Sequence, residues 1–265
     1  MMIEKITSQQ NPKIKNIIRL QQKSSERREQ NLIVIEGLRE VNLAIKGGFK
    51  IKSAFVCSEI AESDVIEQFS VGADYFDISL NVYQKLAYRG STEGIIVLAE
   101  PQYRTLTDLK LRDNPLIIVL ESVEKPGNLG AILRTADAAS VDAVIVCDPL
   151  TDIYNPNAIR SSVGCVFTNQ VVACSSDEVI QWLQENDIKS FAAALTAKDF
   201  YHETDLTGPT AIIMGTEADG LTEKWLKATD KQIIIPMSGE IDSLNVSTST
   251  AILVFEAMRQ RNFYK

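Results

Sequence analysis

The sequence predicts an α/β protein of two domains, in which a small α/β domain precedes a Rossmann-like domain with a predominantly parallel sheet. First, short apolar runs alternate with helical stretches along most of the 265 residues, as in α/β folds. Second, the runs after residue 116 are continuously apolar, which suits strands covered by helices on both faces. Third, the polar stretch 101–115 lacks apolar periodicity. We therefore expect domains at 1–100 and 116–265 with a linker at 101–115.

Composition favours a soluble globular protein, with 45% hydrophobic and 23% charged residues. No apolar run approaches the ~20 residues that cross a bilayer, and the first residues lack a signal-peptide core. We therefore expect a cytoplasmic protein without membrane contacts. The four cysteines lack metal-site spacing, and His202 is the single histidine, so we expect no metal site, no disulfide and no Ser-His-Asp triad.

Basic residues are concentrated at the start of an acidic chain. The net charge is −8, yet residues 1–30 contribute +4 and the remainder −12. Residues 12–29 are expected to form one helix with a basic residue at every fourth position, namely Lys15, Arg19, Lys23 and Arg27. Two interpretations of this row stay open, a solvated helix face or a row that follows the phosphate backbone of RNA.

The first domain is expected to alternate strands and helices after this basic helix. Its apolar runs predict strands at 32–37, 51–57, 74–78 and 94–100. Helices are expected to end at Gly47–Gly48, to span about 58–69 and to follow residue 78. The polar turn 88–92 contains Arg89 and suits contact with a partner, although most loops of this composition are only connections.

The second domain is expected to open with a βαβ unit. A strand at 116–121 is followed by a glycine-bearing turn, an alanine-rich helix and a further strand. Arg134 is the lone cation on that helix, and an exposed surface arginine is the alternative to a functional one. A helix is expected around Trp182, and the runs that suit strands of the same sheet lie at 157–164, 170–174, 190–195, 211–215 and 231–236.

Small and polar residues follow three of these strands, at Leu195–Thr196, Gly215–Glu217 and Pro236–Met237. Ligands of parallel sheets bind beyond the C-terminal strand ends. After the third strand, Ser243 and Asn245 stand where a helix N-cap belongs, and the first N–H groups of a helix lack intrahelical partners. This junction suits a small polar ligand. The helix that follows is expected to bury an apolar face made of Val246, Leu253, Phe255 and Ala257.

A dinucleotide-binding oxidoreductase is one interpretation of the βαβ unit, because Asp148 follows the glycine turn by about 20 residues. The glycine spacing argues against it, since residues 127–132, GNLGAI, lack the close G-x-G pair.

Taken together, these segments resemble the SpoU (TrmH) family of RNA ribose 2′-O-methyltransferases, within the SPOUT class. Its first motif is similar to PGNLGAILRTADA at 126–138, and its second is similar to IIMGTEADGL at 212–221. Its third is similar to residues 233–260, and a further similarity covers AIRSSVG at 158–164. Residues 1–100 also look like the ribosomal-protein-like RNA-binding domain that many members carry.

The resemblance implies a C-terminal trefoil knot, a homodimer with the active site at its interface, and S-adenosylmethionine as methyl donor. It assigns cofactor binding to Leu195, Thr196, Met214, Gly215, Gly220, Ile235, Met237, Leu244 and Asn245. It assigns catalysis to Arg134, which acts on the 2′-hydroxyl, and to Asn128, Glu217, Ser243 and Asn245. It implies RNA, preferably ribosomal RNA, as substrate, with Arg160, Arg89 and the basic row as its contacts.

Two positions depart from the family pattern. Lys125 stands where members commonly have an acidic residue, and the stretch 247–250, STST, is richer in hydroxyls than the usual alanine-rich one. A non-catalytic RNA-binding or ribosome-assembly protein of the same fold is the alternative to the enzyme, because fold similarity alone does not establish activity.

Overall fold

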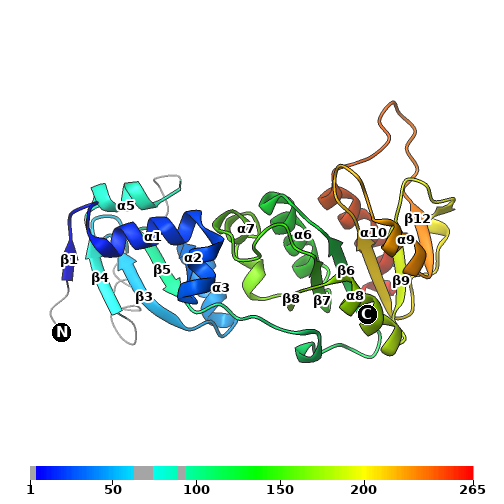
Figure 1. Cartoon of the computed structure of the whole chain (residues 1–265), viewed down its shortest axis with the longest axis horizontal. Coiled ribbons are helices and arrows are strands. Elements are labelled where there is room, and N and C mark those ends of the chain that lie inside the picture. The colour runs from blue at the N-terminus through cyan, green and yellow to red at the C-terminus, as the bar shows by residue number, and fades with distance from the viewer. Residues whose placement is uncertain (1–3, 63–73, 89–92, 265) are drawn as a thin grey trace. The chain divides into compact units, whose positions relative to one another are not determined.

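A seven-stranded, entirely parallel sheet dominates the C-terminal half of this computed structural model, which describes residues 4–62, 74–88 and 93–264 (Figure 1). The strand order is β10-β12-β9-β11-β6-β7-β8, and every neighbouring pair runs parallel. The strands are β6 (Leu116–Glu121), β7 (Ala143–Cys147), β8 (Val171–Cys174), β9 (Lys189–Ala193), β10 (Asp199–Phe200), β11 (Thr210–Met214) and β12 (Lys231–Ile234). The α/β class and the parallel sheet expected from the sequence are confirmed.

Helices cover both faces of this sheet, which is why its central strands β6, β7 and β11 are mainly apolar. Ile117 and Val119 of β6 belong to a core cluster with Val179 and Trp225 of the helices α8 and α9, while Ile118 points to the opposite face and is equally buried. Helix α6 packs against β7 and α10, and α10 also packs against β11. The helices are α6 (Pro126–Ala138), α7 (Pro156–Ser161), α8 (Ser176–Glu185), α9 (Glu223–Ala228) and α10 (Val246–Gln260).

A five-stranded mixed sheet organises the N-terminal half, in the order β1-β4-β3-β5-β2. Strand β5 runs antiparallel to β2 and β3, whereas β4 runs parallel to β1 and β3. The elements are β1 (Glu4–Ile6), α1 (Pro12–Gln22), α2 (Ser24–Gln30), β2 (Ile33–Glu36), α3 (Leu38–Lys46), β3 (Ile51–Val56), β4 (Asp74–Ile78), α5 (Leu80–Leu86) and β5 (Ile95–Ala99). Of the helix expected at 58–69, residues 63–69 lie outside the described residues, and residues 58–62 form a turn and a bend rather than a helix.

The basic segment forms two helices rather than the single helix predicted for 12–29. Lys23 is extended at φ −121° and ψ 118°, which ends α1 and begins α2. The break turns Arg27 inward, where it is 2% exposed and donates from Nη1 to the carbonyl of Leu20 at 2.6 Å. A buried guanidinium that caps the end of α1 is structural, so including Arg27 in an exposed basic row was wrong. Lys15, Arg19 and Lys23 are exposed.

Three further expectations differ from the structure. Residues 157–164 are not a strand, because Asn155 accepts a hydrogen bond from the Asn157 N–H and Pro156 begins α7, two features typical of a helix start. Strand β12 ends at Ile234, two residues before the expected end at 236. Phe255 is 42% exposed and lies outside the buried face of α10, which is formed by Val246, Thr250, Leu253, Val254, Ala257 and Met258.

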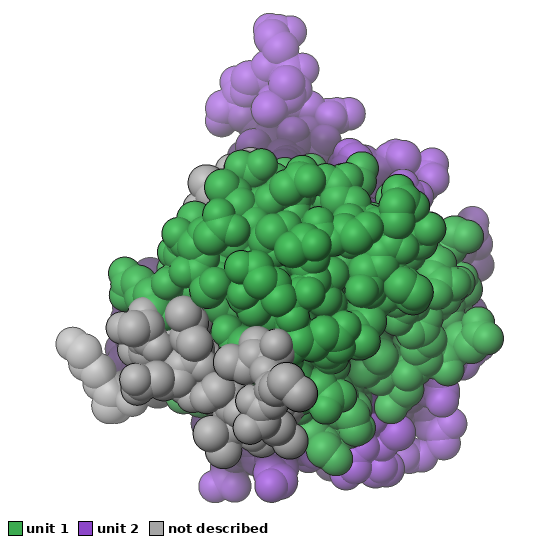
Figure 2. All heavy atoms as spheres, turned by 90° about the vertical axis from the view of Figure 1, so that its left-hand side faces the viewer, with its two compact units in different colours: residues 1–102, 154–168 green, residues 103–153, 169–265 purple. Residues whose placement is uncertain are grey.

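The chain divides into two units, coloured separately in Figure 2. Unit 1 comprises 1–102 and 154–168, and unit 2 comprises 103–153 and 169–265. The segment 154–168 belongs to unit 1 because Tyr154 and Phe167 pack edge-on against Phe49, with ring centroids 5.9 and 4.9 Å away. The domain boundaries expected at 100 and 116 remain a prediction about independent folding.

Candidate functional site

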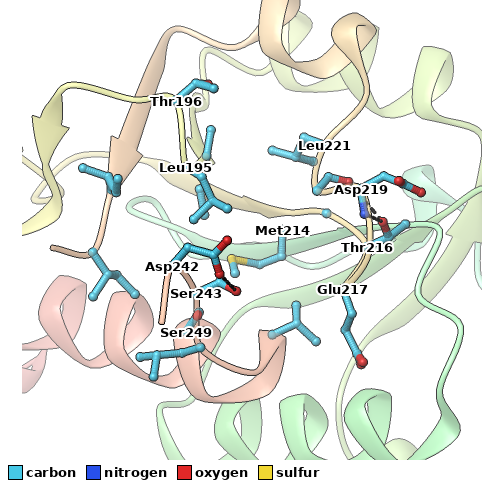
Figure 3. A pocket seen from close by; sticks show the side chains of 18 of the residues that line it. Leu195, Thr196, Met214, Thr216, Glu217, Asp219, Leu221, Asp242, Ser243 and Ser249 are labelled. Carbon is cyan, nitrogen blue, oxygen red and sulfur yellow. Dashed lines mark hydrogen bonds between the residues drawn. The ribbon is translucent and has the colours of Figure 1, made fainter. Parts of the chain in front are cut away.

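A cavity of about 760 Å³ opens at the C-terminal ends of β9, β11 and β12 (Figure 3). Three loops supply its walls, at 193–196, at 214–221 and between β12 and α10. The lining includes every residue to which the resemblance assigned cofactor binding, namely Leu195, Thr196, Met214, Gly215, Gly220, Ile235, Met237, Leu244 and Asn245. Parallel strands bring these ends to one edge of the sheet, which is where such folds bind ligands.

The middle wall is a tight turn that only glycine permits at its start. The Thr216 N–H donates to the Gly220 carbonyl at 2.9 Å, and the Gly220 N–H donates back to Thr216 at 3.2 Å. A Cβ at Gly215 would overlap the backbone of Gly220, and Gly220 itself has φ of +70°. The turn therefore presents backbone groups to the cavity at close range.

Asn245 joins the third wall to helix α6. As N-cap of α10, its Oδ1 accepts from the Ser247 N–H at 3.0 Å and from the Ser247 hydroxyl at 2.6 Å. Its Nδ2 donates to Oδ1 of Asn128 at 3.3 Å, although the two residues are 117 positions apart. Nδ2 of Asn128 is buried and has no hydrogen-bond partner among the described residues.

A second contact ties the start of α6 to the cavity. Lys125, the N-cap residue of α6, forms an ion pair with Glu217, which lines the cavity. The Lys125 side chain is 67% exposed and the Glu217 side chain 29% exposed. The departure from the family pattern at Lys125 therefore supplies a cation that faces the glutamate of the second motif.

The residues expected to be catalytic do not all meet at this cavity. Glu217, Ser243 and Asn245 line it, and Asn128 reaches it through Asn245. Arg134 lies farther along α6 and is exposed, and its side chain makes no hydrogen bond or ion pair with any described residue. It is absent from the cavity lining of its own chain.

The residues expected to contact RNA lie in unit 1. The exposed part of the basic row is Lys15, Arg19 and Lys23. Arg160 stacks its guanidinium over the ring of Tyr88 at 3.5 Å and donates to Oδ1 of Asn157 at 2.9 Å. Arg89 lies outside the described residues.

Two acidic residues of the cavity lining were not found from the sequence. Asp219 and Asp242 line the cavity beside Glu217, and Oδ1 of Asp242 accepts from the Ser243 hydroxyl at 3.1 Å. Aspartates are common in exposed turns, so no local signal distinguishes these two. Their position within the second and third motifs was the available hint.

Cys147 and Cys174 are unsuited to act as nucleophiles. None of the four cysteines is in a disulfide, and burial together with the nearby Glu178 and Asp148 carboxylates raises the pKa of Cys174 to about 12. Burial likewise raises the pKa of Cys147, so both thiols are protonated at neutral pH. Within the described residues, no cluster of His, Cys, Asp or Glu has the arrangement of a metal site, and no helix has the length and apolar character needed to cross a membrane.

Comparison with known proteins gives matches along most of the chain. Residues 115–255 match the family model described as "SpoU rRNA Methylase family", and residues 11–97 match the "MRM3-like substrate binding domain". The Bacillus subtilis 23S rRNA (guanosine(2553)-2′-O)-methyltransferase RlmP is 28% identical and aligns over 96% of this chain and 98% of its own. The Escherichia coli 23S rRNA (guanosine-2′-O-)-methyltransferase RlmB is 36% identical over 64% of this chain and 72% of its own.

Solved structures extend the similarity to the whole fold. A crystal structure of an RNA 2′-O ribose methyltransferase has a TM-score of 0.85 and 39% identity, with coverage of 97% of this chain and 99% of the other. An AdoMet-bound rRNA methyltransferase from Sinorhizobium meliloti has a TM-score of 0.89 and 28% identity, with coverage of 97% and 98%.

Proposed function

Because the chain belongs to the SpoU rRNA methylase family, we propose that it transfers a methyl group from S-adenosylmethionine to a ribose 2′-hydroxyl of ribosomal RNA. The observation that carries this proposal is the convergence of the second and third motifs, with the loop at 193–196, on one cavity at the C-terminal strand ends. The hydrogen bond between Asn128 and Asn245 also joins the start of α6 to this edge of the sheet. The protein is thus an S-adenosylmethionine-dependent RNA methyltransferase.

The cavity fits this cofactor in size and chemistry. Its volume of about 760 Å³ lies within the range of ~300–1,000 Å³ that is usual for small-molecule sites. Leu195, Ile235 and Leu244 offer apolar surface to an adenine ring, and the turn at Gly215 offers backbone donors and acceptors. Among the described residues, the lining contains no Lys, Arg or His, so recognition of the adenine there rests on shape and hydrogen bonds and not on a cationic side chain.

The residues of the chain have to align the ribose hydroxyl with the methyl group, exclude water and assist loss of the hydroxyl proton. The bound cofactor supplies an electrophilic methyl group on a sulfonium. Asn128, with its unsatisfied Nδ2, Ser243 and Asn245 position the nucleotide at the cavity. Arg134 orients the 2′-hydroxyl and stabilises the developing alkoxide, because a guanidinium carries a positive charge and only donates hydrogen bonds.

A homodimer accounts for the position of Arg134. In its own chain the arginine does not line the cavity and has no partner among the described residues. An arginine of one copy that serves the cavity of the other would be placed in this way, and we propose that arrangement, with the trefoil knot that the family resemblance implies. Arg134 of one copy and the cavity of the other would then form one site at the interface.

Ribosomal RNA is the proposed substrate because the curated relatives named above are 23S rRNA methyltransferases. Unit 1, which matches a substrate-binding domain, holds the exposed Lys15, Arg19 and Lys23, and these cations suit a phosphate backbone. We propose a cytoplasmic enzyme on the same basis. Methylation mapping of ribosomal RNA from cells with and without the gene identifies the target nucleotide.

Substitution of Arg134 tests the proposed mechanism. Arg134→Ala is expected to lower the methyl-transfer rate at least 100-fold, while calorimetry gives the same affinity for S-adenosylmethionine, because the proposed partner of the side chain is the ribose 2′-hydroxyl and not the cofactor. Equal loss of transfer and cofactor affinity would indicate a structural role. Wild-type protein that binds the cofactor without turnover on any ribosomal RNA fragment would favour the non-catalytic alternative, and binding of NAD instead would overturn the proposal.

A further inference from the structure

The cavity is acidic, and the methyl donor proposed to bind in it carries a net charge of +1. The cavity lining includes the carboxylates of Glu217, Asp219 and Asp242 and, among the described residues, has no basic side chain. Glu217 is paired with Lys125, which offsets its charge. Asp219 and Asp242 form no ion pair with any described residue, so two negative charges at the cavity are uncompensated.

Asp242 is the better placed of these two carboxylates. It lies on the loop between β12 and α10, and Figure 3 shows its side chain among the cavity residues together with Leu195, Met214 and Ser243. The hydrogen bond from the Ser243 hydroxyl to Oδ1, at 3.1 Å, holds the carboxylate and leaves its other oxygen open. Leu195 and Met214 present apolar surface beside it, and a charge next to apolar surface is screened less than one surrounded by water.

We propose that Asp242, assisted by Asp219, makes the cavity select the charged methyl donor over its spent product. The inference rests on the proposed function. In the transfer, the bond between sulfur and the methyl carbon breaks and its electron pair stays on sulfur, while the ribose oxygen bonds the methyl carbon and releases the hydroxyl proton to solvent water. The sulfonium becomes a neutral thioether, so the net charge of the ligand falls from +1 to 0 and its attraction to the carboxylates weakens.

Asp242 is a specificity residue for the cofactor and not a catalytic residue. The positive charge that it attracts is present in the bound donor and is already diminishing in the transition state, so the attraction favours binding more than the chemical step. Loss of the carboxylate should therefore raise KM for S-adenosylmethionine and leave kcat equal or slightly higher. Because both aspartates are exposed to solvent, the expected effect is three- to tenfold, where tenfold corresponds to about 1.4 kcal/mol.

The test is titration calorimetry of the full-length protein with S-adenosylmethionine and with S-adenosylhomocysteine, at low and at high salt. Asp242→Asn keeps the size and the hydrogen-bond acceptor but removes the charge, and Asp219→Asn is a second variant on a separate loop. Glu240→Gln is the matched control, because Glu240 is exposed on the same loop as Asp242 and does not line the cavity. Near-ultraviolet circular dichroism verifies that each variant is folded.

Asp242→Asn is expected to lower the affinity for S-adenosylmethionine three- to tenfold and to change the affinity for S-adenosylhomocysteine by less than twofold. Glu240→Gln is expected to change neither affinity. The wild-type preference for the charged ligand should also diminish at high salt. An unchanged ratio of the two affinities in both aspartate variants, or an equal loss for both ligands, would overturn the inference while the methyltransferase site stands. Wild-type protein that binds neither ligand would remove the inference and the proposed function together.

Discussion

The hydrogen bonds of Asn245 serve two purposes that substitution should separate. Its Oδ1 caps α10 through the Ser247 N–H at 3.0 Å, and its Nδ2 reaches Asn128 at 3.3 Å. Loss of an N-cap costs about 1 kcal/mol, and loss of a long neutral hydrogen bond costs about 0.5 kcal/mol. Asn245→Ala should therefore lower the free energy of unfolding by about 1.5 kcal/mol. Asn245→Ser keeps a capping hydroxyl but is too short to reach Asn128, so it should cost only about 0.5 kcal/mol.

Urea unfolding followed by tryptophan fluorescence measures these differences in the right part of the chain. The two tryptophans, Trp182 and Trp225, both belong to unit 2, as does Asn245. Methyl transfer from labelled S-adenosylmethionine to ribosomal RNA should fall strongly in both variants, because both lose the link to Asn128. A serine variant as unstable as the alanine variant would refute the capping argument, and full activity in the serine variant would refute a functional role for the Asn128 contact.

Two further predictions concern buried and exposed charges. Burial disfavours the charged form of Asp142, but hydrogen bonds from the Arg112 guanidinium and from the N–H groups of Leu116 and Arg112 outweigh it and lower its pKa. This stabilisation is complete above the unfolded pKa of ~3.9 and is lost as pH falls through the lower folded pKa, so Asp142→Asn should destabilise by about 1–3 kcal/mol at pH 7. In urea titrations the difference in unfolding free energy between the wild type and Asp142→Asn should shrink as the pH falls toward 3. A difference that does not depend on pH would contradict the assignment. In unit 1, Lys15→Glu with Arg19→Glu should weaken RNA binding and reduce its salt dependence in filter-binding assays without changing cofactor affinity, whereas Arg27→Ala should lower the melting temperature because it leaves the Leu20 carbonyl unpaired. Unchanged RNA binding in the double variant would favour the other interpretation, in which Lys15 and Arg19 belong to a solvated helix face.

Periodicity and turn chemistry predicted the principal strands well, because strands buried on both faces are apolar without interruption. They failed where a contact outside the segment decides the local conformation. The basic stretch is broken at Lys23, and Arg27 turns inward to a carbonyl, neither of which a four-residue spacing of cations can reveal. The two-residue strand β10 was also missed, since it pairs only with β12 and carries no pattern of its own.

By itself, the sequence determined which chemical groups are present and in what order. The motifs at 126–138, 212–221 and 233–260 supply a glycine turn, an N-capped helix and a set of polar side chains, and their resemblance to one family indicated their use. The tertiary structure alone decided which of those groups meet. Lys125 pairs with Glu217 across 92 residues and Asn128 with Asn245 across 117, and two aspartates without a local signal face the same cavity. Local periodicity reports the conformation of neighbouring residues, whereas contacts of this length arise from the order of parallel strands in the sheet, which gathers distant loops at one edge.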